Sequence, residues 1–124
     1  MSKYRNYFKI IFYFIIIIAK SDKQMQIYKA YILNLNNTYF SGKKYNVETI
    51  GYDAEFDLLT IKGLENENSA IIYFKAFLEN KDHLAKLNQK GYNAFIITVS
   101  NFGEMYKKRD TSGYLTFFLG NYMK

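Results

Sequence analysis

The chain has 124 residues, of which 49% are hydrophobic and 23% charged, and it contains no cysteine and no proline. This length and composition predict one folded domain with a hydrophobic core, and they exclude a disordered chain, a disulfide framework and thiolate metal sites. The formal net charge of +6 keeps nucleic acid and anionic membranes among the partners to be considered.

The charge is distributed unevenly along the chain. Residues 1–44 carry a net +7, residues 45–67 carry −5 and residues 68–124 carry +4. Such asymmetry can attract nucleic acid or a membrane surface. However, nearly all of the basic residues are lysine, and Ile, Asn, Tyr and Phe are heavily used. These residues have AT-rich codons, so we interpret much of the lysine excess as the mark of an AT-rich genome and as solvent-facing charge.

The first predicted element is Tyr7–Ala19, which we interpret as a central β-strand. Its uninterrupted apolar run, Ile10–Ala19, is ten residues long, whereas a membrane-spanning helix needs about 20. The run consists largely of β-branched and aromatic residues, which favour strands. A continuous apolar run, unlike an alternating one, is typical of a strand that is covered on both faces.

A secretory signal or membrane anchor is the alternative for the same segment. Lys3, Arg5 and Lys9 would supply its positive leader. Ala19 has Ile17 two places before it, so the expected small-x-small cleavage site is missing, and without cysteine a lipoprotein anchor at this end is excluded. A membrane is therefore an expected partner only if residues 7–19 are an anchor.

A helix is predicted from about residue 22 to residue 40, because apolar residues recur there at helical spacing. Ser21 or Asp22 is expected to cap its first turn. Ser41 and Gly42 are expected to end it, since glycine tolerates the left-handed cap conformation. The apolar face is formed by Met25, Tyr28, Ile32, Leu35 and Tyr39, with Ile27 and Tyr31 beside it.

An antiparallel hairpin is predicted next, with strands at residues 45–52 and 58–64. In the second strand, Leu59 and Ile61 share one face, and Thr60 and Lys62 share the other. The turn, residues 53–57, holds three acids. These acids lack the spacing and the closing glutamate of an EF-hand loop, so we interpret them as a solvated hairpin tip.

A second helix follows, capped by Asn66, Asn68 or Ser69, with apolar positions from Ala70 to Leu87 and an end at Gly91. Residues 80–82 are expected to break it into two. The single histidine, His83, has charged neighbours, and one exposed histidine without cysteine or a second histidine does not make a metal site.

The last predicted elements are a strand at residues 92–100, a short helix and a C-terminal helix. Asn101 and Glu104 have the spacing of a capping box for the short helix. Asp110, Thr111 or Ser112 is expected to cap the last one. Between them, Lys107, Lys108 and Arg109 lie where cations favour the negative end of a helix dipole. These three residues are the only candidate contact residues on the surface.

The order β-α-β-β-α-β, with helices added at the C-terminus, predicts an α+β domain of the ferredoxin-like type. Such a domain has four antiparallel strands with two helices on one face, and its first and third strands are central. The strongly apolar Tyr7–Ala19 suits a central position.

Residues from about Leu35 to Tyr122 resemble the C-terminal domain of the large tetratricopeptide-repeat lipoproteins of the Bacteroidota type IX secretion and gliding-motility apparatus. In that family a short apolar strand, matched by Tyr7–Ala19, precedes the domain. The domain also lies behind a lipid-anchored repeat array, whereas here it stands alone from Met1. The stretches that carry the resemblance are Asn36–Ser41, Ile71–Phe77, Leu87–Tyr92, Phe95–Phe102 and Gly113–Phe118.

The resemblance implies a non-enzymatic protein-interaction module of this machinery, with a protein partner and a periplasmic or envelope location. A core strand at residues 7–19 with no separate signal implies the cytoplasm instead. The sequence predicts no catalytic, cofactor or metal residues, because clustered nucleophiles, ligands and paired carboxylates are missing. The alternatives are an RNA-binding ferredoxin-like domain and a small secreted or membrane-anchored protein. A homodimer through an edge strand is also left open.

Overall fold

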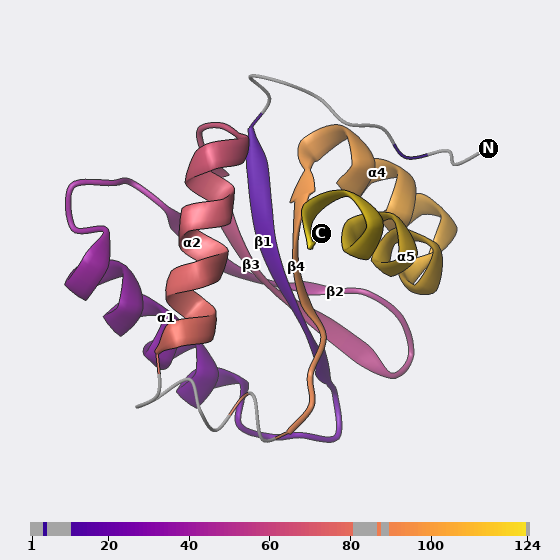
Figure 1. The fold of residues 1–124 in the computed structure, drawn as a ribbon. Coiled ribbons are helices and arrows are strands. Elements are labelled where there is room, and N and C mark those ends of the chain that lie inside the picture. Colours follow the sequence, from indigo (N-terminus) through magenta and orange to yellow (C-terminus); the bar gives the residue numbers. More distant parts are fainter. Residues whose placement is uncertain (1–3, 5–10, 81–86, 88–89, 124) are drawn as a thin grey trace.

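The computed structural model describes Tyr4, residues 11–80, Leu87 and residues 90–123 of the chain, and they form a four-stranded sheet and four helices (Figure 1). In chain order the elements are β1 (Phe12–Ala19), α1 (Met25–Tyr39), β2 (Asn46–Gly51), β3 (Phe56–Leu64), α2 (Glu67–Glu79), β4 (Ala94–Thr98), α4 (Val99–Lys108) and α5 (Thr111–Tyr122). The fold is therefore α+β, as the sequence predicts. His83 and the predicted break at residues 81 and 82 lie outside the described residues.

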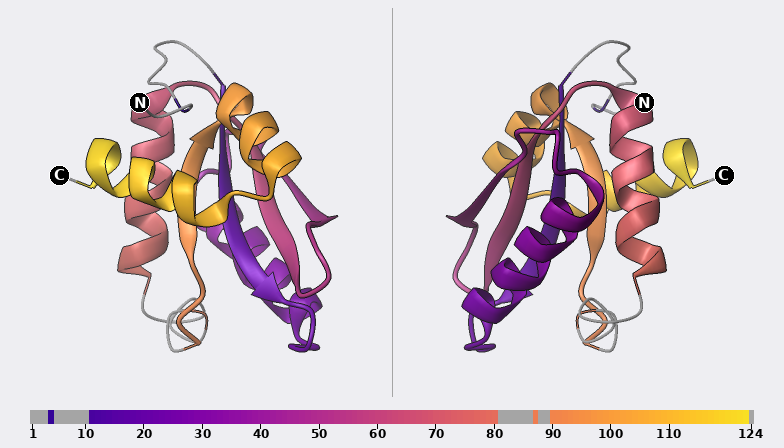
Figure 2. Two further views of the ribbon diagram at one scale, coloured as in Figure 1. Left: turned by 90° about the vertical axis from the view of Figure 1, so that its right-hand side faces the viewer. Right: turned by 90° about the vertical axis from the view of Figure 1, so that its left-hand side faces the viewer.

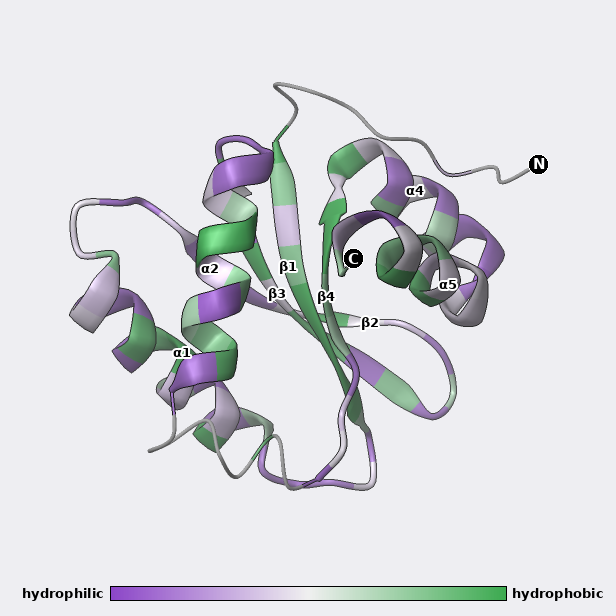
Figure 3. Cartoon of the chain, viewed as in Figure 1, coloured by the Kyte–Doolittle hydropathy of each residue, from purple (hydrophilic) through white to green (hydrophobic). Residues whose placement is uncertain are grey.

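The strand order in the sheet is β2-β3-β1-β4, and every neighbouring pair is antiparallel. The first and third strands are thus central. Phe12–Ala19 pairs with β3 on one side and with β4 on the other, so the strand interpretation is confirmed for these residues, whereas residues 7–10 lie outside the described part. Figure 3 shows β1 as hydrophobic along most of its length, and Phe12, Phe14 and Ile15–Ile18 are all buried.

One face of the sheet packs against α1 and α2 (Figures 1 and 2). The side chain of Phe14 in β1 points to this face, where its ring lies 4.9 Å from that of Phe77 and 5.3 Å from that of Tyr73. In the register of β1 and β3, Phe14 is the cross-strand partner of Ile61, and Ile16 is the partner of Leu59. Cross-strand partners point to the same face of a sheet. Leu59 and Ile61 therefore share this face, as predicted.

The other face is covered by α4 and α5, which the sequence presented only as additions to the fold. Tyr13 of β1 packs edge-on against Phe102 of α4, with ring centroids 5.3 Å apart. On β4, the ring of Phe95 lies 5.2 Å from that of Tyr114 in α5. Thr60 shares this second face and is fully buried, although a sheet with helices on one face alone would leave it in water. Helices on both faces explain why β1 is apolar at every position.

Helix α5 crosses β4 and reaches α2 (Figure 2, left). Near its start, Tyr114 packs on Phe95 on the second face. Further along, Phe118 packs edge-on against Phe74 of α2, with centroids 5.5 Å apart, and Tyr122 packs edge-on against Phe12. The helix therefore closes the side of the sheet at β4.

The outer edge of β4 is tied to α5 by one hydrogen bond. The buried Tyr114 hydroxyl donates to the carbonyl oxygen of Ile96 over 2.5 Å. Tyr4 adds to this corner, because it packs edge-on against Tyr114 and donates to the Asp110 carboxylate over 3.2 Å. A covered edge is one way in which proteins prevent strands of other molecules from pairing with a sheet.

The predicted ends of α1 are wrong in detail. Gln24, not Ser21 or Asp22, is the N-cap, and its side chain makes no capping hydrogen bond. The helix ends at Tyr39 with Phe40 as its C-cap, whose φ is −132°, so Gly42 is not used as a left-handed cap. Asp22 instead accepts from the amide of the N-cap residue Gln24 through Oδ1, and from two tyrosines, described below, through Oδ2.

The other helix starts were partly predicted. Asn66 caps α2 by accepting from the Ser69 amide over 2.8 Å, and Asp110 caps α5 by accepting from the Gly113 amide over 3.1 Å. The capping box of Asn101 and Glu104 is wrong. Thr98 caps α4, accepting from the Asn101 amide, so the helix begins directly after β4. Gly91 has a φ of 70°, which suits the left-handed position that was expected there.

Candidate functional site

The three basic residues that the sequence analysis named as candidate contacts, Lys107, Lys108 and Arg109, lie in two different environments in the structure. Lys107 and Lys108 lie exposed in the last turn of α4, where they favour the negative end of the helix dipole. Arg109 follows as a left-handed residue with a φ of 53°. Its guanidinium lies 4.2 Å from the ring centroid of Tyr106 and 5.3 Å from that of Tyr52, and it donates to the Tyr106 carbonyl oxygen. Arg109 thus folds back onto its own helix.

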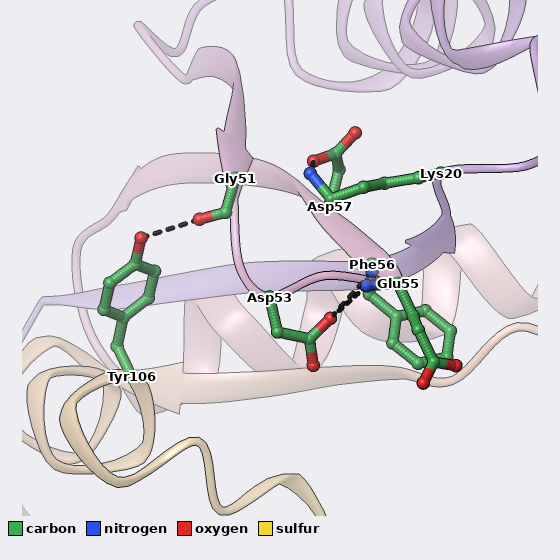
Figure 4. Close-up of polar contacts among 7 residues, drawn as sticks. All are labelled: Lys20, Gly51, Asp53, Glu55, Phe56, Asp57 and Tyr106. Carbon is green, nitrogen blue, oxygen red and sulfur yellow. Dashed lines mark hydrogen bonds and ion pairs between the residues drawn. The ribbon is translucent and has the colours of Figure 1, made fainter.

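Of the three acids of the hairpin tip, Asp53 closes the turn and Asp57 forms an ion pair with Lys20 (Figure 4). The Asp53 carboxylate accepts from the backbone amides of Glu55 and Phe56, each over 2.8 Å. The Asp57 carboxylate, which belongs to β3, pairs with Lys20 over 2.7 Å. The residues that the structure describes contain no group of three acidic, histidine or cysteine side chains able to hold a metal ion. The hairpin itself is confirmed by the antiparallel pairing of β2 with β3 on either side of this turn.

A pocket of about 340 Å³ lies beside this turn, at the end of β1. Asp53, Tyr92 and Thr111 bring polar groups to its wall. Each of these groups already has a partner within the chain, since Asp53 closes the turn, Thr111 shares a hydrogen bond with the Tyr52 hydroxyl, and Tyr92 donates to Asp22. The pocket walls are therefore engaged in holding the fold together.

Asp22 connects three parts of the chain. Its Oδ2 atom accepts from the hydroxyls of Tyr28 in α1, over 2.6 Å, and of Tyr92 before β4, over 2.5 Å. These two hydrogen bonds, from Tyr28 first, hold the pKa of the Asp22 carboxyl below its usual 3.8. Burial, with Asp22 beside it, raises the pKa of the Tyr28 hydroxyl to about 12.

Replacement of Asp22 with asparagine is expected to remove a part of the pH dependence of stability. Because the folded-state pKa of Asp22 is depressed, the stability it contributes is fully present above its unfolded pKa of 3.8 and is lost as the pH falls through the folded value. The difference in unfolding free energy between the natural chain and Asp22→Asn should be largest near neutral pH and should shrink towards about pH 3. Urea titrations across this range measure it, and a difference independent of pH would contradict the assignment.

A second, apolar depression lies between α2 and α5, and we call it the α2–α5 groove. Its volume is about 140 Å³. One wall is formed by Ile71, Phe74, Lys75 and Leu78 of α2. The floor and the other wall are formed by Ile96, Phe118, Tyr122 and Met123. The ring contact between Phe74 and Phe118 fixes the spacing of the two helices.

Two of the side chains that line the groove are also exposed to solvent. Leu78 is 45% exposed and Met123 is 44% exposed, and both line the groove. Ile72 of α2, 50% exposed, and Leu119 of α5, 58% exposed, add apolar surface on the same two helices. Exposed apolar side chains that line one groove, as Leu78 and Met123 do, are more typical of interaction sites than single exposed residues are.

Two polar groups of the groove have no partner among the residues that the structure describes. The Tyr122 hydroxyl is buried and makes no hydrogen bond with any of these residues, and its pKa is raised to about 12 by burial and, less, by the nearby Glu67. The Lys75 ammonium group is exposed and forms no ion pair with any described residue. Both groups are hydrogen-bond donors at neutral pH.

The groove was not anticipated from the sequence, which identified Ile71, Phe74, Leu78, Phe118 and Tyr122 only as apolar positions of two helices. Phe74 and Phe118 are indeed buried, but Leu78 is exposed. A signal was present: Ile71 and Ile72 are neighbours in α2, and Phe117, Phe118 and Leu119 follow one another in α5. A helix cannot direct consecutive residues to one face.

No family model, curated protein or solved structure matches the chain. Within the described residues, no helix has both the length and the apolar character needed to cross a membrane.

Proposed function

We propose that this chain is a non-enzymatic protein-interaction module and that its docking surface is the α2–α5 groove. The observation that carries the proposal is the apolar groove between α2 and α5 at the surface, which the exposed side chains of Leu78 and Met123 border. The two faces of the sheet, by contrast, are covered by helices. Elsewhere in the described part of the chain, three carboxylates stabilise the fold. Asp22 accepts from Tyr28, Asp53 closes the hairpin turn, and Asp110 caps α5.

The partner we propose belongs to the type IX secretion and gliding-motility machinery, with an envelope location. The support is the sequence resemblance, and two of its stretches, Ile71–Phe77 and Gly113–Phe118, lie on the two helices that border the groove. The same resemblance would then account for surface apolar residues on α2 and α5.

We also infer that the sheet is of the ferredoxin-like type. The order β2-β3-β1-β4 with antiparallel neighbours supports this class, as do α1 and α2 on one face. Helices α4 and α5 would then be additions that cover the second face.

The RNA-binding alternative gains no support from the sheet. Proteins with this topology that bind single-stranded RNA stack bases on aromatic side chains of an accessible sheet face. Here the aromatic residues of the second face, Tyr13 and Phe95, pack against Phe102 of α4 and Tyr114 of α5. Base stacking on them would require both helices to move away.

A matched pair of substitutions tests the proposed docking surface. Leu78 in the groove and Leu33 on α1 are the same residue type, and each is 45% exposed. We expect a tagged natural chain to capture components of the secretion machinery from a Bacteroidota lysate. Leu78→Glu should lose them and Leu33→Glu should retain them, because only the first places a carboxylate in the apolar groove. Quantitative mass spectrometry of the captured proteins measures the difference.

Two results would contradict the proposal. Capture of no envelope component by the natural chain would remove the link to the secretion machinery. Equal loss of capture with Leu33→Glu and Leu78→Glu would show that the effect does not depend on the groove. Circular dichroism of both variants checks that each remains folded.

A further inference from the structure

The sheet has two edge strands, β4 and β2, and α5 covers only the first. At the β4 edge, the Tyr114 hydroxyl donates to the carbonyl oxygen of Ile96. Strand β2 lies at the opposite margin of the sheet, on the far side from α2 and α5 in both views of Figure 2. Among the elements that the structure describes, only β3 pairs with β2. The outer edge of β2 is therefore open within the described part of the chain.

The hydrogen-bond pattern identifies the backbone groups along this edge. Directly after β2, the Tyr52 amide donates to the Phe56 carbonyl oxygen in β3. Because alternate residues of an antiparallel strand bond to the same neighbour, Glu48 also faces β3, whereas Val47 and Thr49 direct their amide and carbonyl groups away from it.

Gly51 has the same outward orientation as Val47 and Thr49. Its carbonyl oxygen accepts from the Tyr106 hydroxyl of α4 over 2.6 Å. The backbone groups of Val47 and Thr49 have no such partner among the described residues. These two residues thus offer two donors and two acceptors to a further strand.

The usual obstacles to edge pairing are missing from β2. Natural edges are often blocked by proline, a bulge or charged side chains. The register of β2 with β3 runs without a shift from Asn46 to Gly51, and the chain contains no proline. The one charged side chain of the strand, Glu48, pairs with Lys62 of β3 over 2.8 Å, so its charge is balanced within the sheet.

The two ends of β2 carry opposite charge, which makes the strand complementary to a second copy of itself. Lys44 precedes the strand, Asp53 and Glu55 follow it, and all three residues are exposed. Neither Lys44 nor Glu55 forms an ion pair with a described residue. An antiparallel second copy brings the basic end of each strand to the acidic end of the other, whereas a parallel copy would place like charges together.

The charges also select the register. A two-fold axis at Glu48 would set two glutamates opposite each other, which is unfavourable. An axis at Val47 would leave Lys44 short of the acidic end of the second copy. An axis at Thr49 places Lys44 beside the turn that contains Glu55 of the second copy.

We infer that β2 pairs antiparallel with β2 of a second copy about a two-fold axis at Thr49, so that two four-stranded sheets become one continuous sheet. The Gly51 carbonyl oxygen, which Tyr106 already contacts, has a second lone pair for the Val47 amide of the copy. Only one six-residue strand takes part, so the dimer is reversible and depends on concentration. This interface goes beyond the proposed function and leaves both α2–α5 grooves accessible.

A proline substitution tests the pairing without removing a bond of the fold. Proline is tolerated on an edge strand where its nitrogen faces outwards, as it does at Thr49. We expect the natural chain to show a monomer–dimer equilibrium in sedimentation velocity, and Thr49→Pro to be monomeric at the same concentrations with unchanged circular dichroism. Glu48→Pro, which removes a bond to β3, should instead unfold at a lower urea concentration. Leu78→Glu should leave the dimer intact.

Cross-linking and charge exchange test the register. The natural chain has no cysteine, so Thr49→Cys introduces a single thiol at the axis, where two facing Cα atoms lie about 5.5 Å apart, within disulfide range. We expect it to form a covalent dimer under mild oxidation, and the exposed Thr38→Cys of α1 not to do so. Lys44→Glu and Glu55→Lys should each weaken the dimer by about five- to tenfold, and the double variant should restore it.

Four results would overturn the inference. These are a natural chain that stays monomeric at all concentrations, a dimer that folded Thr49→Pro preserves, equal cross-linking of Thr38→Cys and Thr49→Cys, and no recovery in the double charge variant. A dimer that Leu78→Glu abolishes and Thr49→Pro preserves would place the second copy on the α2–α5 groove. Loss of the proposed docking function is detected separately, because lysate capture depends on Leu78 and dimerisation on Thr49.

Discussion

A chain that begins at Ser21 is expected not to fold. It lacks β1, the strand that pairs with both β3 and β4. Six side chains of β1 are at most 6% exposed, and at about 1.5–3 kcal/mol each their burial is worth roughly 10–20 kcal/mol. The net stability of a typical domain is only about 5–15 kcal/mol. Far-ultraviolet circular dichroism and cooperative urea unfolding measure the result.

A folded, cooperatively unfolding chain from Ser21 would contradict this expectation. It would favour the alternative in which residues 7–19 act as a targeting signal that is removed. A chain that begins at Tyr4 is the control, because it keeps β1 and the contacts of Tyr4 with Tyr114 and Asp110. The intact mass of the tagged protein from soluble and membrane fractions of a Bacteroidota host gives an independent answer, since removal of a signal shortens the chain by about 20 residues.

Tyr114→Ala is expected to lower the unfolding free energy by about 3–5 kcal/mol, the usual cost of deleting a large buried aromatic ring. Tyr114 is fully buried, and its ring contacts those of Tyr4 and Phe95. The substitution also removes the hydrogen bond to Ile96 that ties α5 to the edge of β4. We therefore expect self-association to increase together with the loss of stability, because an uncovered edge can pair with another chain.

Tyr114→Phe separates the two effects. It keeps the ring and leaves the Ile96 carbonyl without its partner, at a cost of about 1–3 kcal/mol. Leu119→Ala on the same helix is the surface control, since Leu119 is 58% exposed, and it should change stability by less than about 0.5 kcal/mol. Urea titration and light scattering measure both quantities. A Tyr114→Phe variant as stable as the natural chain would show that the hydrogen bond contributes nothing.

The strands were predictable because their residues carry the information locally. The β-branched and aromatic run in Phe12–Ala19 favours a strand without reference to the rest of the chain. The hairpin turn was predictable for the same reason, since the Asp53 carboxylate bonds to amides only two and three residues away. Asn66 and Asp110 were also among the residues expected to cap helices, and both act through amides three residues ahead.

Two predicted caps failed because a distant residue or the end of a strand took precedence. Asp22 was expected to cap α1, but the helix starts three residues later, so the carboxylate accepts from the Gln24 amide before the helix and from Tyr92, 70 residues away in the chain. Asn101 and Glu104 have the right spacing for a capping box, but α4 starts directly from the end of β4, where Thr98 provides the cap. Spacing in the sequence cannot rank such competing partners.

The candidate site was less predictable than the fold. Lys107, Lys108 and Arg109 were visible as a cluster, but the packing of Arg109 on the rings of Tyr52 and Tyr106 depends on β2 and α4 meeting. The α2–α5 groove depends on the angle at which α5 crosses β4 and on the contact of Phe118 with Phe74. The apolar pattern of a single helix predicts neither the crossing angle of α5 nor its contacts with other elements.

The sequence by itself determined that residues 7–19 form an apolar segment whose β-branched and aromatic side chains favour a strand, with a targeting signal as the open alternative, because side-chain shape and hydrophobicity act on each segment locally. Only the tertiary structure decided that α4 and α5 cover the second sheet face, that Thr60 is buried, and that Leu78, Lys75 and Tyr122 border one groove. Those features arise from contacts between segments far apart in the chain, whose geometry is set by the packing of whole layers.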